Sequence, residues 1–156
     1  MICKNQKELD ETLKAGAKSI IIEFGNKVSP AQLKGDSPYE TDVFVEDNYY
    51  VEVNGGLFNV YAKDNAFIVV KSSCEKFSSR LVLFKTSKAN VKSKCRVECY
   101  DDSICRAKDA DIIALNASMI FMEGNCKLEA FDNVIVWNDK GGNEILVKEP
   151  TVSIID

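Results

Sequence analysis

Apolar and polar residues recur with a period of eight between residues 93 and 140. This stretch divides without a gap into six units, SKCRVECY, DDSICRAK, DADIIALN, ASMIFMEG, NCKLEAFD and NVIVWNDK. The fourth position is aliphatic in five of the six units, which carry there Arg96, Ile104, Ile112, Ile120, Leu128 and Val136. A short fixed period is typical of a solenoid, in which each unit buries its apolar face by stacking on its neighbours. The pattern therefore predicts a mainly β, irregular single-domain β-solenoid.

The even period also predicts which side chains point inward, because strand side chains alternate between two faces. We expect the interior to be filled by the second, fourth and sixth positions of the unit, which include Ala110, Ile112, Ala114, Ser118, Ile120, Met122, Cys126, Leu128 and Ala130. The opposite face also carries large apolar residues. Either it packs beneath the N-terminal helix or the basic segment, or the turns shift which position points inward, or it is an exposed stripe that binds a protein partner or a second copy. The residues of this hypothetical interface are Ile113, Phe121, Phe131 and Trp137.

The segment before the repeats predicts a cap. Asn5 followed by Glu8 matches a helix N-cap, and Leu9 and Leu13 then lie on one face, so a short helix is expected over about residues 6–15. The apolar run 19–24 predicts a strand, and the Ser-Pro pair at 29–30 favours one extra helical turn. β-Branched and aromatic runs from residue 41 predict further strands.

These elements give one domain, 1–156, in three parts. Residues 1–56 form a helix-strand cap, 57–140 the repeats, and 141–156 closing strands after a Gly-Gly pair. An Asp-Asn corner between apolar strands occurs at 64–65 and again at 132–133. Their separation of 68 residues is not a multiple of eight. The repeats are therefore expected to be interrupted at about 73–92.

Composition sets limits on compartment and partners. The net charge of −4 is too small to imply a partner, and neither a secretory signal nor a membrane-length apolar run is present. We therefore expect a cytoplasmic protein with no membrane contact. The six cysteines lack zinc-type spacing, and Cys105 and Cys126 are interpreted as small residues stacked in the interior.

The sequence offers little catalytic chemistry. With no histidine, His-dependent triads are excluded, and the glycine pairs match no phosphate-binding motif. We expect no catalytic residues, no cofactor and no metal. The alternative is a carboxylate-based or metal-assisted hydrolase, for which the candidate acids are Asp101, Asp109 and Asp111. Calcium at corner aspartates, including Asp102, would lack the glycine-rich repeat of known calcium β-rolls.

Charge is segregated along the chain. A basic segment without acidic residues contains Lys76, Arg80, Lys85, Lys88, Lys92, Lys94 and Arg96. These cations either protect a strand edge or contact phosphates of a nucleic acid, and the first interpretation is favoured. A hypothetical acidic row on the repeats contains Asp101, Asp109, Asp111 and Asp132. Regularly spaced carboxylates on a rigid stack would present charge as a nucleic-acid duplex does.

The stretches VYAKDNAFIVV, CRAKDADIIAL and LEAFDNVIVWN resemble short tandem-repeat β-solenoid proteins of phages, prophages and gut bacteria. The units of those proteins read roughly Asp/Gly-Asn/Ser-Ala-x-Val-x-Ala-x, and an opening helix often precedes them. The resemblance implies a β-solenoid with a binding or structural role in the cytoplasm of a bacterial host, and it carries over no functional residues. Together with the charge pattern it suggests a non-catalytic protein-binding scaffold. One form of it would be a phage-encoded inhibitor of a host nucleic-acid-handling or defence complex (anti-CRISPR-like).

Overall fold

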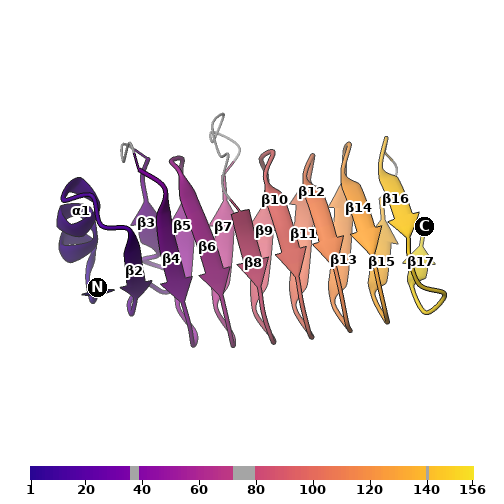
Figure 1. Ribbon diagram of the computed structural model, residues 1–156, viewed down its shortest axis with the longest axis horizontal. Coiled ribbons are helices and arrows are strands. Elements are labelled where there is room, and N and C mark those ends of the chain that lie inside the picture. The colour runs from indigo at the N-terminus through magenta and orange to yellow at the C-terminus, as the bar shows by residue number, and fades with distance from the viewer. Residues whose placement is uncertain (36–38, 72–79, 140) are drawn as a thin grey trace.

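The computed structural model describes residues 1–35, 39–71, 80–139 and 141–156. In these ranges the chain winds into a parallel β-solenoid of two facing sheets, with one helix at the N-terminal end (Figure 1). The predicted mainly β-solenoid fold is confirmed. The helix is α1 (Gln6–Lys14). Sheet A is formed, in spatial order, by β1 (Ile2–Cys3), β2 (Ser19–Ile22), β4 (Thr41–Val45), β6 (Phe58–Ala62), β8 (Arg80–Leu83), β10 (Arg96–Cys99), β12 (Asp111–Ala114), β14 (Lys127–Ala130) and β16 (Glu144–Val147). Sheet B is formed, in the same direction, by β3 (Ala31–Leu33), β5 (Tyr50–Val53), β7 (Phe67–Val70), β9 (Lys88–Val91), β11 (Ile104–Lys108), β13 (Met119–Glu123), β15 (Ile135–Asn138) and β17 (Ser153–Ile155).

One coil of the solenoid contains two of the eight-residue units. Each unit supplies a short strand and a corner, so the chain alternates between sheet A and sheet B. Strands pair in parallel with the strand of the same sheet in the next coil; Val97, for example, lies opposite Ile112, and Cys105 opposite Ile120. Parallel stacking of this kind satisfies the backbone groups of every internal strand.

The interior is a narrow apolar layer between the two sheets. From residue 109 onward the predicted inward positions are buried, and Ala110, Ile112, Ser118 and Ile120 are at most a few per cent exposed. Before residue 109 the inward positions are shifted by one residue, so Arg96 and Ile104 at the fourth position point outward. The buried residues there are Cys95, Val97, Cys99, Ser103, Cys105 and Ala107.

A shortened corner causes this shift. Ala107 and Ala110 are successive buried residues separated by three positions, whereas Cys99 and Ser103 are separated by four. Because strand side chains alternate, the loss of one corner residue exchanges inward and outward positions relative to a strict eight-residue period.

Six corners that lead from sheet A to sheet B, from β4–β5 through β14–β15, share one backbone feature. Each of these six holds a residue with φ between 53° and 59°, and these residues are Asp47, Asp64, Lys85, Asp101, Asn116 and Asp132. Asn and Asp tolerate the left-handed region better than other residues with a side chain. The recurring Asp-Asn corner in the sequence is therefore a backbone requirement of the turn, and Lys85 is the exception to it.

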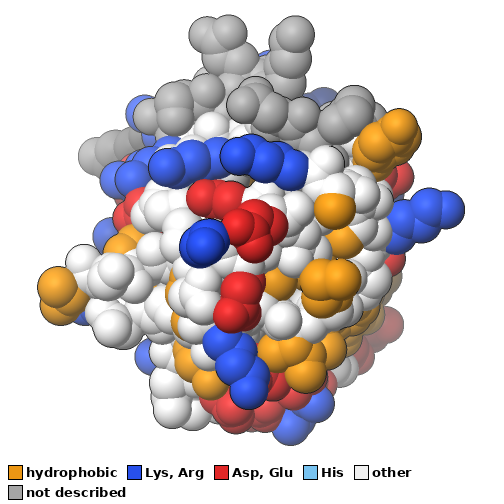
Figure 2. All heavy atoms as spheres, turned by 90° about the vertical axis from the view of Figure 1, so that its left-hand side faces the viewer, with side chains coloured by type: hydrophobic (Ala, Val, Ile, Leu, Met, Phe, Trp, Pro, Cys, Tyr) orange, Lys and Arg blue, Asp and Glu red, His pale blue; other side chains and the backbone are white. Residues whose placement is uncertain are grey.

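The N-terminal end is capped as expected. The side chain of Asn5 accepts a hydrogen bond from the backbone N–H of Glu8 at 3.0 Å, and Leu9 and Leu13 are buried against the first coil. This confirms the predicted helix. Viewed from this end, charged side chains run across the middle of the molecule (Figure 2).

The helical turn expected near residue 30 is wrong, because residues 31–33 form strand β3. Ala31 and Leu33 are buried and lie opposite Val51 and Val53 of β5. The local cap signal of the Ser-Pro pair is overridden by the core contacts and backbone pairing that an extended segment makes here.

The boundaries of the repeats also differ from those expected. The coils begin at β2 and β3, so most of 1–56 belongs to the solenoid, and only β1 and α1 precede the first coil. Within the expected interruption at 73–92, β8 and β9 are regular strands in register with their neighbours. Residues 72–79, including Lys76, lie outside the described ranges. The closing segment continues both sheets as a last coil, β16 and β17.

The described cysteines are buried free thiols, including Cys105 and Cys126, as the sequence predicted. Contact with Cys99 and burial raise the pKa of Cys105 well above its ordinary value, and burial raises the pKa of Cys126. These thiols therefore act as small apolar residues in a thin core. Cys74 lies outside the described residues.

Candidate functional surfaces

The outer face of sheet B carries two adjacent rows of apolar side chains over its C-terminal half. Register places Ile104 opposite Met119 and Met119 opposite Ile135 in the first row. The second row runs through Phe121, Trp137 and Ile155. We call these six residues the apolar face. Five of them are half-buried, and Ile155 is 44% exposed.

Aromatic stacking orders the centre of the apolar face. The rings of Phe121 and Trp137 are stacked with centroids 4.6 Å apart and planes inclined by 8°. On the other side, the guanidinium carbon of Arg106 lies 5.6 Å from the centroid of Phe121, within the range of a cation–π contact. Each ring is thus held between neighbours one coil away, and the strands beneath are fixed by parallel pairing.

A shallow hollow adjoins this face toward the N-terminal end. It encloses about 240 Å³ and is lined by Phe67, Lys88, Ala89, Asn90, Ile104, Arg106 and Phe121. Aromatic rings thus lie at both ends of the hollow, with two cations between them. The combination favours a ligand surface that is apolar and bears acidic groups.

The outer face of sheet A is charged over the same coils. Its first row contains Arg96, Asp111, Lys127 and Glu144, in which signs alternate from strand to strand. The second row alternates apolar and acidic residues, with Glu98, Ile113, Glu129 and Leu146. This alternation supports pairing along the sheet, as for Lys127 Nζ and Glu144 Oε2 at 3.5 Å.

Glu98 is the most buried acid of this face, with its side chain 4% exposed. Its carboxylate accepts hydrogen bonds from Arg80, whose Nε lies at 2.9 Å, and from the hydroxyl of Tyr100 at 3.1 Å. Arg96 Nε lies 3.1 Å from Oε1. Burial alone would raise the pKa of Glu98, but the hydrogen bonds and charges of these partners outweigh burial and lower it. The carboxylate is thus held as an anion by structural partners.

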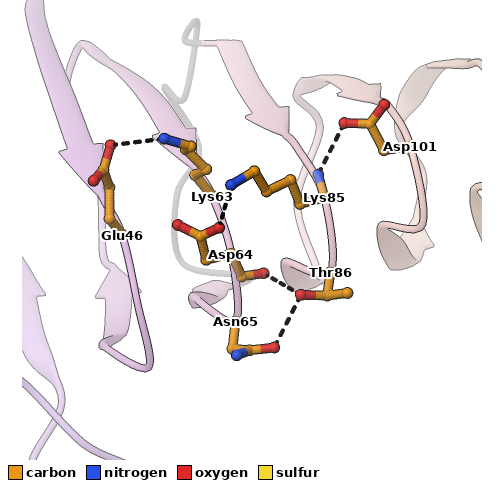
Figure 3. Close-up of polar contacts among 7 residues, drawn as sticks. All are labelled: Glu46, Lys63, Asp64, Asn65, Lys85, Thr86 and Asp101. Carbon is orange, nitrogen blue, oxygen red and sulfur yellow. Dashed lines mark hydrogen bonds and ion pairs between the residues drawn. The ribbon is translucent and has the colours of Figure 1, made fainter.

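A ladder of polar contacts runs along the corners between sheets A and B (Figure 3). Lys85 Nζ donates to Asp64 Oδ1 at 2.7 Å, and the Lys85 backbone N–H donates to Asp101 Oδ2 at 3.2 Å. The hydroxyl of Thr86 donates to the carbonyl of Asp64 at 2.8 Å. Hydrogen bonding from Lys85 lowers the pKa of Asp64, and Asp64 raises the pKa of Lys85. These carboxylates are thus used in corner structure.

The hypothetical apolar stripe is divided by the structure. Phe121 and Trp137 lie together on sheet B, whereas Ile113 is on the outer face of sheet A and Phe131 is at the corner after β14. The residues that complete the real face are Ile104, Met119, Ile135 and Ile155. The third position of the eight-residue unit, which holds Met119 and Ile135, was the available signal. Ile104 lies at the fourth position of its unit instead, because the shortened corner shifts the outward positions by one residue.

The basic segment is spread around the circumference. Arg80 and Arg96 lie on sheet A, Lys88 on sheet B and Lys85 at one corner, while Lys92 and Lys94 lie at the opposite corner. The hypothetical acidic row is likewise divided. Asp101 and Asp132 share the corner after sheet A, Asp109 lies at the other corner, and Asp111 is on the outer face of β12. The corner row is interrupted by Lys85 and Asn116.

The described ranges contain few clustered metal-ligating side chains. No group of three or more His, Cys, Asp or Glu side chains there is placed to hold a metal ion. The helix in this part of the chain is too short and too polar to span a bilayer.

The chain matches no protein-family model, no curated protein and no solved structure. The class of protein therefore follows from the fold, which is a two-sheet parallel β-solenoid with a helical N-terminal cap. The resemblance to repeat proteins of phages and gut bacteria stays a prediction.

Proposed function

We propose that this protein is a non-catalytic scaffold that binds another protein through the apolar face of sheet B. The observation that carries the proposal is the pair of adjacent apolar rows across β11, β13, β15 and β17. On the outer face of sheet A in the same coils, charged residues alternate with Ile113 and Leu146, so no continuous apolar row runs there. Contiguous apolar surface of this kind marks interaction sites.

The composition of the face suits a protein ligand. Trp137 and Arg106 are of the types that contribute most binding free energy at protein interfaces, and Phe121 is of a type enriched there. Their stacking fixes the rings before a partner arrives, which lowers the entropy cost of binding. Lys88 and Arg106 beside the hollow favour a partner whose apolar ridge is flanked by Asp or Glu.

A narrower form of the proposal is a phage-encoded inhibitor acting in the cytoplasm of a bacterial host. In this form the apolar face blocks a host nucleic-acid-handling or defence complex. The apolar face is favoured over acidic mimicry as the means of binding, since the corner row is interrupted by Lys85 and its acids are engaged in turn contacts. A hydrolase would need acids other than the trio Asp101, Asp109 and Asp111, which are distributed over two corners and a strand.

The proposal is tested by site-specific photo-crosslinking. A photoreactive phenylalanine analogue is placed at Phe121 and, as the matched control, at Ile113, an apolar outward position on the opposite sheet. Both proteins are exposed to bacterial lysate, and adducts are identified by mass spectrometry. We expect a discrete adduct from position 121 that is absent at 113.

The partner is then titrated against a Phe121→Asp/Trp137→Asp variant and against Ile113→Asp. We expect at least tenfold weaker binding for the first and little change for the second, with circular dichroism as the check that each is folded. Equal binding by both variants would refute the apolar face as the site. Adducts that are the same from positions 121 and 113 would do so as well.

A further inference from the structure

The last coil of the solenoid has an open end. β16 pairs with β14 and β17 pairs with β15, and each is the outermost strand of its sheet (Figure 1). Val147 and Ile154 occupy inward positions, in register with the fully buried Ala130 and Val136 of the preceding coil. They are nevertheless 42% and 44% exposed. Among the described residues, no strand pairs with the outer edges of β16 and β17, so this end presents two open strand edges and the cross-section of the core.

At the opposite end, sheet A ends in β1, a strand of two residues that offers little edge for pairing. Helix α1 covers the first coil, and its Leu9 and Leu13 side chains are buried against that coil. The edge strand β3 is engaged by the side-chain amide of Gln6, which accepts from the Gln32 N–H at 2.8 Å and donates to the Gln32 carbonyl at 2.9 Å. Charged side chains cross this end of the molecule (Figure 2). The N-terminal end of the solenoid therefore blocks the addition of a strand, whereas the C-terminal end is open to it.

We infer that a second copy of this chain docks on the open end, tail to tail, to form a twofold-symmetric dimer. A twofold axis along the sheet normal sets β16 antiparallel to β16 of the second copy, and β17 antiparallel to its counterpart. Both open edges are then paired and both exposed core sections are covered. Because the N-terminal ends are blocked, assembly closes at two chains.

Charge selects the register of the β16 pair. Inward side chains must face inward side chains across an antiparallel pair, which allows only registers shifted by two residues. One of these sets Leu146 on the axis, opposite itself, and brings Glu144 opposite Lys148 of the second copy. This register forms two symmetry-related ion pairs between Glu144 and Lys148, one on each side of the axis. Neighbouring registers leave Glu144 opposite Leu146 or Pro150.

The dimer has a consequence for the apolar face. Rotation about the sheet normal keeps sheet B of both copies on the same side, so the two apolar faces adjoin across the axis at Ile155. A partner would then meet a surface twice as long. The dimer itself does not depend on the proposed binding function.

The oligomeric state tests the inference directly. Light scattering coupled to size exclusion should give twice the chain mass of 17.4 kDa over a range of concentrations. Val147→Lys/Ile154→Lys places two lysines on the open end and should give a folded monomer. The matched control is Val28→Lys, a change of the same kind at a side chain that is 95% exposed and remote from this end, and it should stay dimeric.

The register is tested by charge exchange and by crosslinking. Lys148→Glu should weaken the dimer about tenfold, and adding Glu144→Lys should restore it. Under mild oxidation, Leu146→Cys should form an interchain disulfide, whereas Val28→Cys should not. The crosslink keeps the test decisive should the lysine variant fail to fold.

Three outcomes would overturn the inference. They are a wild-type monomer at all concentrations, a mass that keeps growing beyond two chains, and a folded monomer produced by Phe121→Asp/Trp137→Asp. The last would place the self-association surface on the apolar face instead. A dimer that persists in that variant, while partner binding is lost, would separate the two proposals.

Discussion

The side-chain amide of Gln6 makes both backbone hydrogen bonds of Gln32, at 2.8 Å from the N–H and 2.9 Å to the carbonyl. A primary amide presents the same donor and acceptor as a peptide group, so Gln6 takes the place of a neighbouring strand at the edge of sheet B. A helix side chain thereby ends a sheet that would otherwise continue to accept strands.

Gln6→Ala should expose this edge. The loss of two hydrogen bonds at a partly buried site should lower the free energy of unfolding by about 1–2 kcal/mol. The variant should also aggregate on standing at high concentration, because the freed β3 edge of one dimer can pair with the freed β3 edge of another. Denaturant unfolding and light scattering measure the two effects. Lys7→Ala, an exposed change on the same helix, is the control and should show neither.

Asn116 is a corner residue in the left-handed region, with φ of 59°, and its substitutions should differ in their effect on stability. Glycine adopts this conformation without strain, whereas a Cβ, and more so a branched one, is unfavourable there. Asn116→Gly should be close to neutral, Asn116→Ala should cost about 1 kcal/mol, and Asn116→Val about 2 kcal/mol. Urea unfolding gives the order. Ala117→Val, one position along the same exposed corner, should leave stability unchanged; a similar loss there would mean that corner packing sets the effect.

The solenoid could be predicted from the sequence because alternating side-chain directions and the stacking of coils produce a short, even repeat of apolar positions. It also located the N-terminal helix, since the cap at Asn5 and the apolar pair Leu9 and Leu13 are local signals. It did not reveal strand β3, whose conformation depends on pairing with β5, a contact made 20 residues away. Local signals at Ser29 and Pro30 favoured a helix instead.

The surfaces were predicted less well for a related reason. Whether two outward residues adjoin depends on which sheet carries each, and the eight-residue unit does not distinguish the sheets. Ile113 and Phe121 occupy the same position of their units yet lie on opposite sides of the molecule. A repeat of two units, with the first unit assigned to one sheet and the second to the other, would have placed these two residues on different sheets.

A column of buried hydroxyls offers a stabilising substitution. Ser87, Ser103 and Ser118 occupy the same inward corner position in successive coils, and their hydroxyls have no hydrogen-bond partner within the described residues. An unsatisfied buried hydroxyl is unfavourable. Ser103→Ala should therefore raise the free energy of unfolding by about 1 kcal/mol, since alanine already occupies this position at Ala66.

Thermal and denaturant unfolding of Ser103→Ala provide the test. Ser93→Ala, at a half-exposed serine outside this column, is the matched control and should not stabilise the protein. A loss of stability in Ser103→Ala would show that the hydroxyl makes a favourable contact in solution.

The contribution of Glu98 to the stability of the fold should depend on pH. Arg80, Tyr100 and Arg96 hold its pKa below the ordinary value of about 4.3 despite burial. Because the folded-state pKa is lowered, the ionised carboxylate contributes stability above the unfolded-state pKa, and that contribution is lost as the pH falls through the folded-state pKa. Glu98→Gln removes the ion pairs but keeps the shape. It should cost about 1–2 kcal/mol at pH 7, a value reduced by the partial exposure of both arginines.

The decisive measurement is the difference in unfolding free energy between wild type and Glu98→Gln from pH 7 down to pH 2.5. The difference should be constant at neutral pH and shrink only below about pH 4.3, because the wild-type carboxylate then becomes protonated and resembles the amide. Glu129→Gln, an exposed acid in the same row of sheet A, is the control and should change little at pH 7. A difference that grows as the pH falls would mean that burial dominates and raises the pKa, so that the arginines do not stabilise the anion as the geometry requires.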